Sequence, residues 1–265
     1  MGSLQLRGLI GVVHLLPTPG APAGRPGGGM DELLEGAVRD AAAFVEGGVS
    51  QLVVENYHDA PFWKAGVAAE TIAALALAVD RVRRVDGVDG VGVNVLRNDA
   101  RAALGIAAAT GAGFVRVNVH TGAMFTDQGL IEGLAAETLR ERARLAPSVQ
   151  ILADVHVKHA TPIQGEAIED AARDAVHRGR ADGLIVSGVA TGSAPSAERV
   201  AQVRAAVGDS VPILIGSGFR LENAGELLAH ADGAIVGTAA KVDGVVAHAV
   251  DPQRVAALVQ AAAKA

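Results

Sequence analysis

Cysteine is absent from the 265-residue chain, and aromatic residues make up only 3% of it. The absence of cysteine excludes disulfides, thiolate metal sites and cysteine nucleophiles, and it fits a protein of the reducing cytoplasm. With so few aromatic side chains, the chain has little material for stacking nucleic-acid bases. Its net charge is -6 and its Lys and Arg residues are scattered, so neither nucleic acid nor an anionic membrane is expected as a partner.

Long apolar runs are missing as well. No stretch approaches the ~20 apolar residues that a membrane-spanning helix needs, and residues 1–11 do not have the pattern of a signal peptide. We therefore expect no transmembrane segment and a cytoplasmic location. Half of the residues are nevertheless apolar, with alanine prominent, which favours a folded protein of Ala-rich helices packed on a sheet.

Short β-branched runs alternate with Ala-rich helical segments along the whole chain. The strand candidates are residues 9–14, 51–55, 91–95, 114–119, 150–157, 183–187, 213–216 and 233–236. The helix candidates are residues 30–46, 69–84, 99–110, 130–145, 166–177, 195–207, 221–230 and 252–263. Eight strands, each followed by a helix, predict an α/β fold: a single (βα)8 TIM barrel domain over residues 1–265. A doubly wound open sheet is the alternative, and it would need fewer strands.

One segment interrupts this rhythm. Residues 17–29 are rich in Pro and Gly and form too long a connection for a simple βα loop. In a barrel this loop would hang over the mouth at the carboxyl ends of the strands, as a lid or as a flexible insert. The Ala-rich helices could also pack between subunits, which allows a homo-oligomer.

Polar residues alternate with apolar ones in three consecutive predicted strands. The polar positions are Asp154, His156 and Lys158 in one strand, Arg116, Asn118 and His120 in another, and Asn94 with Arg97 just beyond it in the third. Glu55 and His14 end the second and first strands and extend the same rim. Burying so many polar groups is costly unless they pair with one another or serve a ligand. We interpret them as the wall of a binding site inside the barrel.

This wall predicts acid–base chemistry. We expect Asp154 or Glu55 to act as general base, Lys158 or His156 as acid or enolate stabiliser, and Arg116 to orient the oxygens of the substrate. The alternative is that Asp154 pairs with Arg116 or Lys158 in a structural network. Lys158 could also form a Schiff base, because a desolvated lysine can have a lowered pKa, although a carboxylate neighbour would raise that pKa.

A divalent metal is a further alternative. The residues that could supply nitrogen and oxygen ligands are His14, Glu55, Asp154 and His156. No compact ligand spacing supports such a site, and the nearby side chains of Lys158 and Arg116 would repel a cation. The sequence therefore assigns no metal and no cofactor.

Glycines gather at the ends of the seventh and eighth predicted strands. The residues are Gly216, Ser217 and Gly218 at the first end and Gly237 and Thr238 at the second. Backbone N–H groups without bulky side chains can approach an anion, and many barrels hold a phosphate on these two loops. Either glycine group alone could simply form a tight turn, but together they predict a phosphate site.

Six segments resemble a known family. They read HLLPTPG at 14–20, ENYHDAPF at 55–62, NVLRND at 94–99, RVNVHTGA at 116–123, ADVHVKH at 153–159 and GSG at 216–218. In these segments the chain is similar to the BtpA/SgcQ family, and the resemblance covers nearly the whole chain. It implies a TIM barrel like those that bind ribulose phosphate. The family takes its name from a factor needed for photosystem I accumulation, and another branch belongs to a sugar-utilisation gene cluster, so the resemblance implies no single reaction.

We therefore predict a barrel that binds a small phosphorylated ligand, a sugar phosphate or a nucleotide fragment, and that acts as an isomerase or lyase. The expected substrate-binding residues are His14, Asn56, Asp59, Asn94, Arg97, Asn118, His120 and Ser187. The alternatives are a non-catalytic factor for the biogenesis of photosystem I or another protein complex, and a metal-dependent hydrolase.

Overall fold

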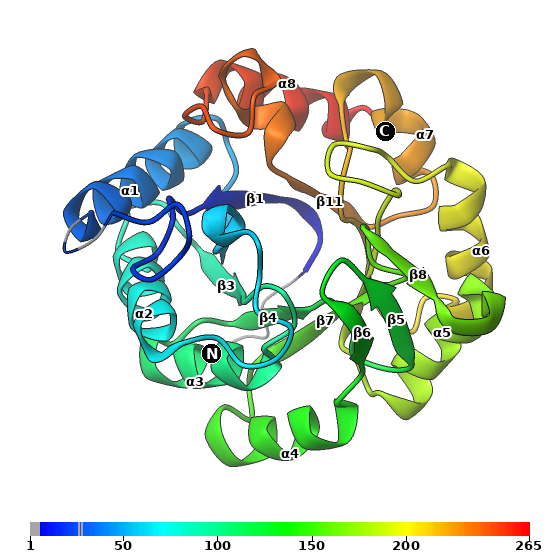
Figure 1. The fold of residues 1–265 in the computed structure, drawn as a ribbon. Helices are drawn as coiled ribbons and strands as arrows, with labels where there is room; N and C mark the ends of the chain where they lie inside the picture. The colour runs from blue at the N-terminus through cyan, green and yellow to red at the C-terminus, as the bar shows by residue number, and fades with distance from the viewer. Residues whose placement is uncertain (1–5, 26, 28) are drawn as a thin grey trace.

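The computed structural model describes residues 6–25, 27 and 29–265, and eight parallel strands of this part close into a barrel (Figure 1). They are β1 (Gly8–His14), β2 (Gln51–Glu55), β3 (Gly90–Asn94), β4 (Phe114–Val117), β7 (Gln150–Val155), β9 (Gly183–Val186), β10 (Ile213–Ile215) and β11 (Gly233–Val236). Strand β1 pairs in parallel with both β2 and β11, which closes the sheet. The predicted TIM barrel is confirmed, and the open sheet is wrong.

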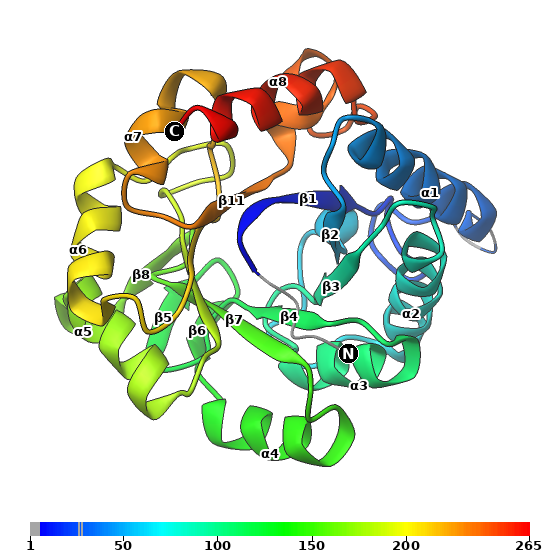
Figure 2. The same ribbon diagram turned by 180° about the vertical axis from the view of Figure 1, so that it is seen from behind.

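Eight α-helices of the described part surround the barrel in a ring, which Figure 2 shows from the opposite side. They are α1 (Met30–Glu46), α2 (Ala69–Arg83), α3 (Ala100–Thr110), α4 (Ala135–Leu145), α5 (Ile168–Arg173), α6 (Ala197–Val207), α7 (Ala224–Leu228) and α8 (Pro252–Ala263). A π-helical turn, Asp174–Arg178, continues α5. Not one of the described helices has the length and apolar character needed to span a bilayer.

Strand alternation divides the apolar core into two parts. Residues that face outward, such as Val13, Val54 and Val93, pack against the helices. A second buried cluster fills the barrel interior with residues that include Ile10, Phe114 and Leu152. Gly92 makes room for the Phe114 ring, because a Cβ at residue 92 would lie 2.2 Å from that ring. The interior below the mouth is therefore a packed apolar core.

The structure corrects the helix predicted over residues 130–145, because α4 begins only at Ala135. The preceding residues form a hairpin of β5 (Ala123–Thr126) and β6 (Gly129–Glu132), and β5 also pairs with β8 (Ala160–Pro162). Gly129 makes the hairpin turn with a positive φ of 87°. This antiparallel sheet lies at the α4 and α5 side of the barrel (Figure 1).

The strand predicted over residues 150–157 ends at Val155 because His156 has a positive φ of 50°. A residue in this conformation breaks the strand alternation. The interpretation that Asp154, His156 and Lys158 share one face therefore fails at His156, and the structure places this side chain away from the interior wall.

Candidate functional site

A row of polar side chains crosses four neighbouring strands at the mouth of the barrel. In the strand register, His14 pairs with Glu55, Glu55 with Asn94, and Asn94 with Arg116. Residues paired in this way on parallel strands point to the same face of the sheet. Each of the four stands two residues after an interior position such as Val12 or Val53, so the row forms the upper layer of the barrel interior.

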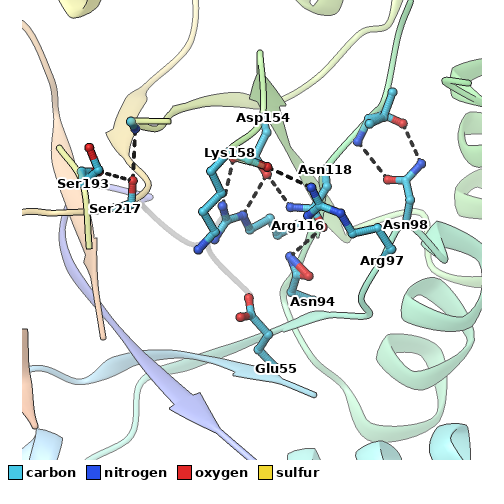
Figure 3. Close-up of polar contacts among 12 residues, drawn as sticks. Glu55, Asn94, Arg97, Asn98, Arg116, Asn118, Asp154, Lys158, Ser193 and Ser217 are labelled. Carbon is cyan, nitrogen blue, oxygen red and sulfur yellow. Dashed lines mark hydrogen bonds and ion pairs between the residues drawn. The ribbon is translucent and has the colours of Figure 1, made fainter. Parts of the chain in front are cut away.

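Asp154 completes this layer from β7 and binds two of the polar side chains (Figure 3). Nε and Nη2 of Arg116 donate to its two oxygens, both at 2.9 Å, and Nδ2 of Asn118 donates at 2.7 Å. The side chains of Arg116 and Asp154 are only 2% and 0% exposed. Burial opposes the charge on Arg116, but the charge and hydrogen bonds of Asp154 outweigh it and raise the pKa of Arg116. The structural pairing considered for Asp154 is therefore present.

A cavity of about 520 Å³ opens above this layer. Its lining joins two of the predicted groups: the polar wall contributes His14, Glu55, Arg116 and Lys158, and the glycine-rich strand ends contribute Gly216, Ser217, Gly218, Gly237 and Thr238. The fold thus brings three of the five predicted catalytic residues and the predicted phosphate-binding residues to one cavity. Asp154 and His156 are not in this lining.

Burial governs the protonation of two wall residues. It lowers the pKa of Lys158, even though the Glu55 carboxylate opposes that shift, and Arg116 lowers the pKa further. Burial also holds the pKa of His14 well below its usual range, and the charges of Lys241 and Lys158 act in the same direction. Nε2 of His14 lies 3.9 Å from Oε1 of Glu55, so a neutral imidazole stands beside the cavity carboxylate.

The glycine-rich side of the cavity is partly committed to holding loops together. The N–H of Gly216 donates to the Val186 carbonyl at 2.8 Å. The Ser217 hydroxyl donates to the Ser193 carbonyl and accepts the N–H of Gly188. The Gly216 N–H and the Ser217 hydroxyl therefore hold the end of β9 and the loop after it in position.

Close packing against the backbone of the neighbouring loop requires glycine at residue 218, whether or not a ligand binds there. Its φ is +68°, and a Cβ there would lie 2.1 Å from the backbone nitrogen of Ala194. At Gly237, by contrast, a Cβ would meet the His14 ring at 2.8 Å, on the cavity side. A side chain at Gly237 would therefore intrude on the site itself.

The cavity lining also contains residues that were absent from the predicted site. Among them are Thr191 and Gly192 of the loop after β9, Arg220 after β10, and Arg254 in the first turn of α8. The Arg254 Nε donates to the Ala239 carbonyl at 3.0 Å, and Arg220 donates to the Gly192 carbonyl at 3.0 Å. The Asp251-Pro252 helix start after the eighth strand is the sequence signal that could have pointed to Arg254.

Other predicted substrate-binding residues serve to connect the loops. Asn56 accepts the Leu96 N–H at 2.8 Å and donates to Asp59 at 3.0 Å. Asp59 in turn accepts both the N–H and the hydroxyl of Thr18 at 2.8 Å. These contacts fix the beginning of the 17–29 loop, of which Pro26 and Gly28 lie outside the described residues. The described part of this loop contributes no residue to the cavity lining.

Arg97 and Asn98 fix the loop after β3 (Figure 3). Nη2 of Arg97 donates to the backbone carbonyl of Lys158 at 2.8 Å. Asn98 exchanges hydrogen bonds with the backbone of Val119 at 2.8 and 2.9 Å. Arg97 thus helps to position Lys158 without lining the cavity.

Two predicted histidines lie away from the cavity. Nε2 of His120 binds the Gly179 carbonyl at 2.8 Å behind the wall. Nε2 of His156 lies 3.7 Å from Glu166, and burial together with the charge of Arg199 lowers the pKa of His156 to about 4. The structure therefore separates His156 from Glu55 and Lys158.

Three buried polar atoms of the upper layer have no hydrogen-bond partner in the described structure: Nδ1 of His14, Oδ1 of Asn94 and the hydroxyl of Ser187. His14 and Asn94 end their strands, and Ser187 directly follows β9. A Cβ on Gly216 would lie 2.4 Å from that hydroxyl and 3.5 Å from Arg116 Nη2, so Ser187 is next to the floor of the cavity. Buried atoms that lack partners in this way are suited to bind a ligand.

The predicted metal ligands do not converge. Asp154 is engaged by Arg116, and His156 lies elsewhere, which leaves only His14 and Glu55 of the four together. Across the described residues, no group of three His, Asp or Glu side chains has the arrangement of a metal site. The geometry therefore does not support the metal-dependent hydrolase.

The closed barrel with a polar cavity at the carboxyl ends of its strands defines the chain as a TIM-barrel protein. The chain belongs to the BtpA family, whose model matches residues 5–264. It is 47% identical over 256 residues to the photosystem I biogenesis protein BtpA of Synechocystis sp., covering 97% of this chain and 88% of that protein.

Solved structures with the same fold have little sequence in common with the chain. Thiamine phosphate pyrophosphorylase from Pyrococcus furiosus superposes with a TM-score of 0.61 at 15% identity, over 97% of this chain and 96% of that one. Phosphoribosyl anthranilate isomerase from Thermus thermophilus gives a TM-score of 0.58 at 13% identity, over 97% and 98% of the two chains. At these identities the likeness concerns the fold alone.

Proposed function

We propose that the chain is an isomerase or lyase that binds a small phosphorylated molecule, such as a sugar phosphate or nucleotide fragment, in the barrel mouth. One observation carries the proposal: a single cavity holds a carboxylate and a lysine at one side and glycine-rich strand ends with two arginines at the other. The two solved TIM-barrel enzymes named above, whose names refer to phosphorylated compounds, agree with this assignment by fold alone.

The phosphate end of the ligand would lie against Gly218, Gly237 and Thr238. The backbone there approaches the cavity without side chains at the two glycines, and Arg220 and Arg254 add positive charge. A phosphate group is matched by backbone N–H groups and by guanidinium groups together.

The reacting end of the ligand would face Glu55 and Lys158. Removal of a proton next to a carbonyl group needs a base, and the resulting enolate oxygen needs a positive partner. Glu55 is a better candidate for the base than Asp154, because both oxygens of Asp154 are occupied by Arg116 and Asn118. Arg116 stays in the role of orienting the substrate, since it lines the cavity as well.

Proton exchange tests this proposal without knowledge of the full reaction. The protein is incubated in D2O with ribose 5-phosphate, ribulose 5-phosphate and dihydroxyacetone phosphate, and loss of C–H signals is followed by NMR. We expect exchange with at least one of these compounds, loss of exchange in Glu55→Gln, and normal exchange in Glu226→Gln, a control on α7 away from the cavity. Exchange that persists in Glu55→Gln contradicts the assigned base.

The name of the Synechocystis relative supports a second candidate, a non-catalytic factor in the biogenesis of photosystem I. Complementation separates the two functions. In a Synechocystis strain that lacks its own BtpA, a scaffold role predicts that Glu55→Gln and Lys158→Met variants of this chain restore photosystem I as well as the unchanged chain does. Restoration by the unchanged chain alone favours the catalytic function.

A further inference from the structure

We propose that Lys158 is a nucleophile that forms an imine with the carbonyl carbon of a phosphorylated aldehyde or ketone. This inference rests on the proposed phosphate-binding function and adds to it the class of substrate and a covalent step. It follows from the position of Lys158 among the lysines of the chain and from the groups that surround it.

The chain has only four lysines, and their surroundings differ sharply. Lys64 and Lys264 are exposed. Lys241 is buried and bound to Asp40, whose other oxygen accepts the Val250 N–H, so its amine is committed to a structural ion pair. Lys158 alone lines the cavity.

The backbone of Lys158 is fixed, and its amine is free to react. Its backbone carbonyl is fixed by Arg97 at 2.8 Å. Within the described residues, Lys158 forms no salt bridge of the kind that occupies Lys241. Figure 3 shows the ends of Lys158 and Glu55 turned toward the same space inside the barrel. A nucleophile and a carboxylate therefore face one ligand position.

The environment favours the reactive form of this amine. An imine forms only from the neutral amine, and burial is a recognised way to populate that form at neutral pH. Burial lowers the pKa of Lys158, and Arg116 and Arg97 act in the same direction against the opposing carboxylates of Glu55 and Asp154. The net effect is a lowered pKa for Lys158, although the Glu55 carboxylate by itself would raise it.

The step balances without any added oxidant or metal. The neutral Nζ attacks the carbonyl carbon, the C–N bond forms as the C=O π bond breaks, and the nitrogen loses one proton while the oxygen gains one to give a neutral carbinolamine. With one further proton the hydroxyl group leaves as water, and a protonated imine remains. Glu55 then removes a proton from the adjacent carbon, and the electron pair moves to the imine nitrogen to form an enamine. Return of a proton to carbon restores the protonated imine, and addition of water to its carbon breaks the C–N bond and releases the product and the free amine.

Borohydride trapping tests the imine. The protein is incubated separately with dihydroxyacetone phosphate, glyceraldehyde 3-phosphate and pyridoxal 5′-phosphate, reduced with borohydride, digested and mapped by mass spectrometry. We expect a stable adduct on the peptide that contains Lys158 with at least one probe, and protection by inorganic phosphate. The adduct should be lost in Lys158→Met and Lys158→Arg and retained in Lys64→Met.

Two results would overturn the inference: absence of an adduct on Lys158 with all three probes, or modification of Lys64 and Lys264 to the same extent as Lys158. Binding of glycerol 3-phosphate, which has a phosphate and no carbonyl group, is measured by calorimetry in parallel. Binding without any adduct overturns the imine and leaves the proposed phosphate function standing. An adduct on Lys158 that inorganic phosphate does not compete for, without binding of glycerol 3-phosphate, contradicts the phosphate site instead.

A second experiment measures the pKa of the Lys158 amine directly. It needs no substrate, and it does not depend on the Lys158→Met variant being folded. Reductive methylation with 13C-formaldehyde gives each lysine an NMR signal, and Lys158→Arg assigns one of them. We expect the Lys158 signal to titrate below the usual lysine pKa of about 10.4. Titration at or above that value overturns the argument that the amine is available.

Discussion

The Asp154→Asn substitution tests how far the polar layer is a structural network. The carboxylate of Asp154 is fully buried and accepts three hydrogen bonds, two from Arg116 and one from Asn118, at 2.7 to 2.9 Å. The substitution keeps the shape of the side chain and removes its charge. Arg116, itself 2% exposed, then has no neutralising partner at that position.

Breaking a buried pair on one side costs about 3–5 kcal/mol of unfolding free energy. For domains of roughly this size, each kcal/mol shifts the melting temperature by about 2–4 °C. We therefore expect Asp154→Asn to melt roughly 6–20 °C below the unchanged protein. The exposed pair of Asp170 with Arg173, at 2.6 Å, is the matched control, and Asp170→Asn should change the unfolding free energy by less than about 1 kcal/mol.

Thermal and urea denaturation followed by circular dichroism give both quantities. An Asp154→Asn variant that unfolds within about 1 kcal/mol of the unchanged protein would refute the reasoning, because the cost assigned to an unpaired buried Arg116 would then be absent. Loss of activity with unchanged stability would instead return Asp154 to the role of general base.

Two further predictions concern the barrel core and the loop after β7. Gly92→Ala should cost about 1–3 kcal/mol or more, because the new Cβ would meet the Phe114 ring at 2.2 Å; Gly105→Ala, a helical site with open space, should be neutral or stabilising in the same urea titration. The His156 imidazole should titrate by NMR near pH 4. Since its folded pKa lies below the usual histidine value of about 6.5, the unfolded chain binds the proton first, and the unfolding free energy should fall as pH drops from about 6.5 to about 4. His156→Asn, a residue type that tolerates positive φ, should flatten that dependence, and an unchanged slope would contradict it.

The barrel and the layer of polar groups at its mouth could be predicted because both follow from strand alternation. Eight apolar runs with helices between them are enough to define the closed barrel, and an inward position near each strand end identifies Glu55, Asn94, Arg116 and Asp154. The register that aligns His14, Glu55 and Asn94 could not be read from sequence, yet alternation alone assigned them to one wall.

The features that were missed depend on long-range contacts or on a single backbone angle. Residues 129–132 form a strand because β5 pairs on both edges, once with β6 and once with β8, which lies far along the chain. His156 leaves the wall because its φ is positive, and no residue pattern marks that change. Arg254 reaches the cavity from α8, at the other end of the chain from β1 and β2, so only closure of the barrel brings it to the same cavity as Glu55.

Charged side chains in and around the barrel differ in whether they have a partner, and this difference supports the proposed site. Asp154 with Arg116, and Asp40 with Lys241, satisfy each other with hydrogen bonds, so fold stability is a sufficient reason for their presence. Glu55 and Lys158 face the cavity without such a partner, and burial works against the charge on Lys158. Charged groups that lie in a protein interior without a neutralising partner cluster at functional sites. Arg116 joins the two groups, because it is neutralised by Asp154 and also lines the cavity. The structural ion pair therefore positions one wall of the cavity in which we propose that Glu55 and Lys158 react.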